Sequence, residues 1–105
     1  MARYLVQATY TEAGLQGILN EGGSKRAEVI GRNLMQLGGA VEAVYFALGE
    51  TDVFIIVNLP DNVSAAAFSI ATNASGVVKA KTTVLLTPEE LDTATSFAAR
   101  NRRPA

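Results

Sequence analysis

Six side chains are the candidates for chemistry in this sequence, and all carry a polar or titratable group. They are Gln7, Thr9, Tyr45, Asp52, Lys81 and Thr83. In a dry pocket, burial would raise the pKa of Asp52, and a neighbouring Lys81 or Tyr45 could then exchange a proton with it. The plainer interpretation is that Asp52 accepts backbone hydrogen bonds in a turn and that Tyr45 packs at an interface. We therefore expect no catalytic residue and treat the six as a candidate ligand-binding set.

Two residue types that usually carry chemistry are absent, because the sequence contains neither His nor Cys. Disulfides, thiol nucleophiles and the commonest metal ligands are thereby excluded. The phosphate-binding, dinucleotide-binding and nucleophile-elbow motifs are also missing from the sequence. We expect neither a metal ion nor a cofactor.

Charge and hydropathy narrow the choice of partners. The formal net charge of −1 gives no basic footprint for nucleic acid. No uncharged apolar run approaches the roughly 20 residues of a membrane-spanning helix, and the N-terminal residues alternate between polar and apolar types instead of forming a signal-peptide core. The sequence therefore predicts a cytoplasmic protein that binds neither nucleic acid nor membranes.

Four strands are predicted to position the six candidates. The strongest signal is a hairpin, because two runs rich in Val, Ile, Phe and Tyr flank the polar break Gly49-Glu50-Thr51-Asp52. Residues near both ends of the chain alternate with the period of a half-buried strand. The predicted strands are residues 3–10, 41–48, 53–59 and 78–86.

Helices are predicted between these strands and after the last one. A short helix starts at Thr11 and ends by Leu19, and a stronger one starts at Ser24 after two glycines. The next begins at Asp61 or Asn62. Its expected inner stripe is Val63, Ala66 or Ala67, Ile70 and Ala74, which leaves Phe68 outside as a candidate oligomer contact.

The last predicted helix has the clearest start in the chain. Thr87-Pro88-Glu89-Glu90 combines a cap residue, a proline at the first helical position and a glutamate that completes a capping box. This helix is expected to turn one stripe inward, namely Leu91, Ala94 or Thr95, and Ala98. The chain should then end as a loose basic tail over residues 100–105.

The order of elements predicts one α+β domain over residues 1–99. Strand, helix, hairpin, helix and strand form a split βαβ arrangement with a further helix at the end. Right-handed crossovers place the strands in the order 4-1-3-2, with the helices on one face of an antiparallel sheet. The other sheet face stays open.

That second face is predicted to be too apolar for a monomer, because both faces of the hairpin strands carry apolar side chains. We expect a second subunit, or the C-terminal helix, to cover it. The first and last strands would add a polar lining from Gln7, Thr9, Lys79, Lys81 and Thr83, which is typical of a small-molecule pocket. Alternatively, the two lysines simply discourage edge-to-edge aggregation of sheets.

Several stretches spread over nearly the whole chain resemble the GYD domain family. They are RYLVQATYTEAGLQGIL, GGSKRAE, LGGAVEAVYFALGETDV, LPDNVSAAA and KAKTTVLLTPEEL. The family is named for Gly-Tyr-Asp at the hairpin, and here Gly49 and Asp52 match while Thr51 stands at the tyrosine position. The resemblance implies a ferredoxin-like fold related to dimeric α/β barrel proteins, and it implies no established activity.

Three functions remain open on this sequence. The first and preferred one is a small oligomeric protein that binds a small molecule or regulates another process. The second is a cofactor-independent enzyme of the dimeric barrel type, an oxygenase or isomerase acting on an apolar substrate. Such an enzyme would need Gln7, Tyr45, Asp52 or Lys81 to point into an enclosed pocket. The third is a structural assembly unit that binds no ligand.

Overall fold

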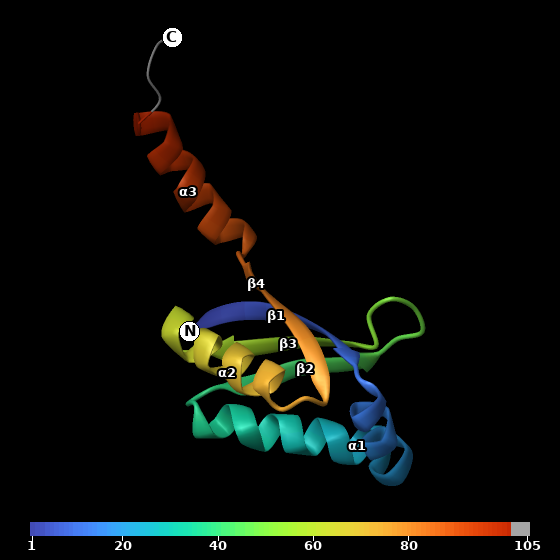
Figure 1. The fold of residues 1–105 in the computed structure, drawn as a ribbon. Helices are drawn as coiled ribbons and strands as arrows, with labels where there is room; N and C mark the ends of the chain where they lie inside the picture. The colour runs from blue at the N-terminus through green and yellow to red at the C-terminus, as the bar shows by residue number, and fades with distance from the viewer. Residues whose placement is uncertain (102–105) are drawn as a thin grey trace.

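The computed structural model describes residues 1–101. Its elements are β1 (Ala2–Tyr10), α1 (Glu12–Gln36), β2 (Ala40–Phe46), β3 (Val53–Leu59), α2 (Asn62–Ala74), β4 (Val78–Leu85) and α3 (Pro88–Asn101) (Figure 1). The strands form one antiparallel sheet in the order β2-β3-β1-β4. This is the predicted order 4-1-3-2 read from the other edge, so the expected ferredoxin-like βαββαβ fold with an added helix is confirmed.

The hydrophobic core lies between the sheet and the two helices α1 and α2. The two central strands supply most of it, through Tyr4, Val6 and Ala8 of β1 and Val53, Ile55, Val57 and Leu59 of β3. These residues occupy every second position, as expected for a strand with one face in the core. Each large apolar side chain that is fully buried stabilises the fold by roughly 1.5–3 kcal/mol. We call this side of the sheet the covered face and the opposite side the open face.

Helix α1 consists of two helical segments that meet at a kink, close to the two separate helices that were predicted. Thr11 caps its start by accepting a hydrogen bond from the Gly14 N–H at 3.3 Å. The chain leaves helical geometry only at Gly22, with φ of 79° and ψ of 175°, a backbone region that is essentially restricted to glycine. The predicted break therefore appears as a kink inside one element. Leu34, near the end of the second segment, is completely buried.

Helix α2 turns a different stripe inward from the predicted one. Phe68 is only 7% exposed and lies in the core with Ala65, whereas Val63 and Ile70 are 79% and 70% exposed. The prediction of Phe68 as an external oligomer contact was therefore wrong. The physical reason is that α2 contains no charged residue, so its apolar positions form more than one stripe of helical period and periodicity alone could not choose between them.

Helix α3 begins as predicted but does not pack on its own domain. Its capping box is present, because the Glu90 N–H donates to Thr87 Oγ1 at 3.1 Å and the Thr87 N–H donates to Glu90 Oε1 at 2.8 Å. None of its residues is buried, and the helix projects away from the sheet (Figure 1). The expected inward stripe of Leu91, Ala94 and Ala98 is therefore exposed, and α3 does not cover the open face.

Two further points concern the C-terminal residues and whether any helix could span a membrane. Arg100 and Asn101 of the predicted basic tail belong to α3, and residues 102–105 lie outside the described residues. Within residues 1–101, none of the helices combines the length and apolar character needed to cross a bilayer.

Candidate functional site

The middle of the open face is an apolar surface that runs across the two central strands and β2. Strand pairing places Tyr45, Phe54, Gln7 and Lys81 in one row that crosses all four strands, and Ala43, Ile56, Leu5 and Thr83 in the next row. Tyr45 is 71% exposed and Phe54 is 37% exposed. Among the described residues no element covers these rows. The prediction of an apolar second face is therefore correct for this chain, and the β2 side of the face is its more apolar part.

A polar hollow of about 390 Å³ lies at the β4 side of the open face, where β1, β4 and the β2–β3 loop meet. Its polar lining consists of Gln7, Thr9, Glu50, Thr51, Lys79 and Lys81. Pairing of Gln7 with Lys81 and of Thr9 with Lys79 brings these side chains together on neighbouring strands. Three of the six candidate residues, Gln7, Thr9 and Lys81, thus share one hollow.

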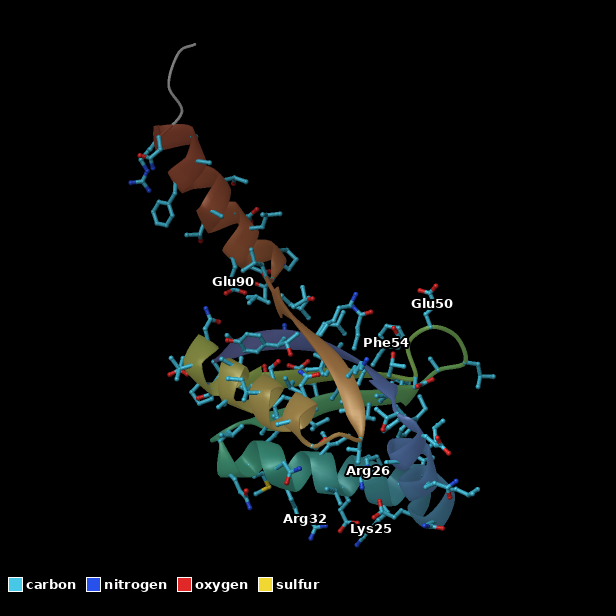
Figure 2. The ribbon with its side chains drawn as sticks, viewed as in Figure 1. Lys25, Arg26, Arg32, Glu50, Phe54 and Glu90 are labelled. Carbon is cyan, nitrogen blue, oxygen red and sulfur yellow. The ribbon has the colours of Figure 1, made fainter. Side chains whose placement is uncertain are left out.

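The β2–β3 loop also contributes to this hollow, which the sequence did not indicate. The Thr9 hydroxyl donates to the Glu50 carbonyl oxygen at 2.9 Å, and this bond ties the loop to β1. The Glu50 side chain points away from the sheet at the crest of the loop (Figure 2). Thr51 of the same loop also lines the hollow.

Asp52 has a structural role in the hairpin. Its Oδ2 atom accepts the Tyr10 N–H at 2.8 Å, and its own N–H donates to the Ala8 carbonyl at 2.9 Å. Its carbonyl oxygen accepts the Ala47 N–H at 2.8 Å. The side chain is thus occupied with backbone hydrogen bonds, in line with the plainer of the two interpretations, and it fastens the hairpin to the end of β1.

The other predicted site residues are spread over the face. Tyr45 lies on the edge strand β2, separated from Lys81 by Phe54 and Gln7. Thr83 pairs with Leu5 in the neighbouring row. Gly49 lies in the β2–β3 loop with open space around it. Tyr45, Asp52 and Lys81 therefore do not converge within one chain.

A second polar cluster lies at the opposite end of the open face from the hollow. Arg3 Nη2 lies 2.7 Å from Glu42 Oε1, which also accepts a hydrogen bond from the Asn58 side chain at 2.8 Å. The hydrogen bond from Arg3, and then that from Asn58, lowers the pKa of Glu42. A β-bulge between Val41 and Ala43 shifts the register of β2 next to Glu42. The sequence period alone could not show this shift.

The covered face has a hollow of its own, a groove of about 530 Å³ between α1 and α2. Its floor is the sheet, through Val6, Val53 and Ile55, and Phe68 forms part of one wall. Arg26 and Tyr10 also line it, and burial raises the pKa of Tyr10. No sequence pattern indicated this groove, because it depends on the spacing of two helices that are far apart in the chain. We call it the interhelical groove.

The part of the chain that the structure describes contains no cluster of side chains that could bind a metal ion. Over residues 1–101 the carboxylates form no group of three that could hold a metal ion. The polar atoms of the open-face hollow come instead from amide, hydroxyl and ammonium groups, together with the loop backbone. Such groups bind polar or anionic parts of organic molecules.

Comparison with known proteins agrees with this architecture. A family model described as GYD domain matches residues 4–95, which span all four strands and the start of α3. No curated protein and no solved structure matches the chain. Since the matched region is most of the chain, the protein belongs to the GYD domain family.

Proposed function

We propose that this chain is a self-associating protein that binds a small molecule between its subunits, with the open face as the interface. The observation that carries the proposal is the uncovered apolar surface formed by Leu5, Tyr45, Phe54 and Ile56. Apolar patches of this kind on soluble domains mark interaction sites. Two sheets packed through their open faces would bury the patch, in the manner of a dimeric α/β barrel.

The ligand is expected to be small and anionic. The open-face hollow carries the ammonium groups of Lys79 and Lys81, beside an amide from Gln7 and a hydroxyl from Thr51. Within the part of the chain that the structure describes, the only carboxylate among the lining residues belongs to Glu50, whose side chain points away from the sheet (Figure 2). A second sheet placed over the hollow would remove water from it and strengthen each of these interactions.

Catalysis is the less supported alternative. A barrel enzyme would need its proton-transfer groups to meet around one substrate. Asp52 is occupied with the Tyr10 N–H, and Tyr45 lies two strands away from Gln7. The positions of these side chains therefore favour small-molecule binding over catalysis. A regulatory role, in which the ligand controls the assembly of subunits, is compatible with such binding.

The interface is tested by measuring molar mass with light scattering over a range of protein concentrations. The wild-type chain should self-associate, and Phe54→Asp should shift it towards monomer, because a charge in a dry interface is costly. Ile70→Asp is the matched control, since it places the same charge on an exposed part of α2. A wild-type chain that stays monomeric at high micromolar concentration would remove the basis of the proposal.

The ligand is tested by a thermal-shift screen of anionic metabolites, because a ligand that binds only the folded state raises the midpoint of unfolding. A hit should lose its effect in Lys81→Ala and keep it in Lys25→Ala, whose lysine points away from the sheet (Figure 2). Self-association without any stabilising metabolite would instead support the structural assembly unit. The cytoplasmic location stays a prediction, which fractionation of expressing cells would check.

A further inference from the structure

The interhelical groove lies on the covered face, so it takes no part in the function proposed for the open face. One stripe of α1 forms a wall, through Arg26, Ile30, Asn33 and Leu37 at helical spacing. These positions extend over about 16 Å of helix at 1.5 Å per residue. The volume of about 530 Å³ is within the range of small-molecule sites, roughly 300–1,000 Å³.

The groove is lined mainly by apolar side chains, although Asn33 and Gln36 of α1 also line it. Val6, Val53 and Ile55 form its floor, and Phe68 and Ala71 of α2 line it opposite α1. Both helices pack on the sheet beneath the groove. A ligand in this position would exchange water for contacts with aliphatic and aromatic side chains, which favours an apolar body.

One end of the groove carries a guanidinium group that is paired with a carboxylate. Arg26 is the only charged side chain among its lining residues within the described part of the chain, and Tyr10, Thr72 and Ser75 add hydroxyl groups. Arg26 extends from α1 towards the sheet, whereas Lys25 and Arg32 point away from it (Figure 2). Its Nη2 atom lies 2.6 Å from Glu21 Oε2, in a pair that leaves the arginine side chain about a quarter exposed.

From this combination we infer that the interhelical groove binds an amphipathic monocarboxylate, with the apolar chain along the sheet and the carboxylate at Arg26. A guanidinium group presents a planar set of donors that matches a carboxylate, and one Nη2 contact to Glu21 leaves further donors on the same group. Arg26 also follows Gly22 by four residues, close to the start of the second helical segment of α1. The positive end of that segment's dipole favours an anion there.

Octanoate is a suitable probe, with uncharged 1-octanol as its matched control, and ¹H–¹⁵N NMR titration of the full chain is the measurement. Octanoate should shift amide signals of α1 and α2 that line the groove, with little effect on β2. Arg26→Gln should weaken octanoate binding about tenfold, because a hydrogen bond to a charged group is lost. It should leave the weaker octanol binding unchanged. Arg32→Gln, on the outer side of α1, should change neither (Figure 2).

Two further variants keep the test decisive if Arg26→Gln disturbs the helix. Glu21→Gln removes the competing carboxylate and should tighten octanoate binding, because the guanidinium becomes free for the ligand. Ala71→Phe fills the groove and should abolish binding, while Ala66→Phe on an exposed position outside the groove should not.

Several results of these titrations would contradict the inference. Absence of octanoate binding to the wild-type chain, or binding that Ala71→Phe does not affect, would overturn the inference. Equal affinity for octanoate in wild type and Arg26→Gln would refute the carboxylate contact. The monomeric Phe54→Asp variant should bind octanoate normally, so failure of the open-face proposal and failure of this one give different results.

Discussion

In the middle of β3 both faces of the sheet carry large apolar side chains, yet only one of the two faces is covered. On β3, Ile55 points into the core and is 3% exposed, while its neighbour Phe54 points to the open face and is 37% exposed. Two helices account for the difference, since α1 and α2 pack on one side and α3 leaves the other uncovered. An apolar strand face is typical of a covered one, and for the open face the cover that we propose is a second copy of the chain.

The sharpest test of this comparison uses two isoleucines that follow each other on β3. Ile55→Ala should lower the free energy of unfolding by about 2–5 kcal/mol, because it leaves a cavity under the helices. Ile56→Ala should cost less than about 1 kcal/mol in dilute protein, because its side chain faces the open side.

Chemical denaturation at two protein concentrations measures both effects. The loss for Ile55→Ala should not depend on concentration, whereas the loss for Ile56→Ala should grow as subunits associate. Equal losses for both variants in dilute protein would break the distinction between the two faces.

Two glycines of α1 test how closely the covered face is packed. A Cβ added at Gly14 would overlap the Val77 carbonyl oxygen, while one added at Gly17 would meet open space. Gly14→Ala should therefore destabilise the chain by about 1–3 kcal/mol through overpacking. Gly17→Ala should stabilise it by up to about 1 kcal/mol, because alanine favours a helix. Thermal unfolding of the two variants measures the contrast, and a stabilised Gly14→Ala would contradict the close approach of α1 to the start of β4.

The smallest effect on stability is expected for substitutions in α3, because this helix packs on neither face of the sheet. The Thr87 N–H hydrogen bond lowers the pKa of Glu90. Because the folded-state pKa lies below the unfolded one, this cap contributes in full above the unfolded value of roughly 4.3. Its contribution is lost as the pH falls through the folded-state pKa.

Far-ultraviolet circular dichroism between pH 6 and pH 2 should accordingly show partial loss of helix at the acid end. Glu90→Ala, which removes the acceptor of the Thr87 N–H, should lose part of that helix signal already at neutral pH, whereas Glu89→Ala, outside the capping box, should lose less. An unchanged helix signal in Glu90→Ala would mean that contacts other than the cap hold α3, such as those with a second subunit.

Local patterns predicted the fold well, because the signals concerned were short-range. Alternation in β1 and β4, the hairpin break and the Thr87 capping box each depend on residues within a few positions of one another. The topology then followed from handedness and short connections.

The sequence could not show which side of a helix faces the core when more than one side is apolar. The uncharged helix α2 offered two stripes, and only packing selected the one with Phe68. The stripe of α3 was correctly apolar, but nothing local indicated that it would face away from its own sheet.

The candidate site was predicted only in part, for a related reason. Pairing of β1 with β4 brought Gln7, Thr9 and Lys81 together as expected. The contribution of Thr51 and the position of Arg26 both depend on a loop or helix folding back over the sheet. Such long-range placement leaves no periodic signal in the sequence.

The bulge in β2 has a consequence for the register of the hairpin. A strand with one polar face resists a one-residue slip, because the slip would bury its polar side chains. The hairpin here is apolar on both sides and lacks that safeguard, so other features must fix the pairing. These features lie at the two ends of the hairpin. One end has the bulge between Val41 and Ala43 and the contacts of Glu42 with Arg3 and Asn58. The other end has the hydrogen bond from the Tyr10 N–H to Asp52. The bulge and these polar bonds therefore favour the observed alignment over a slipped one, which the apolar side chains alone oppose only weakly.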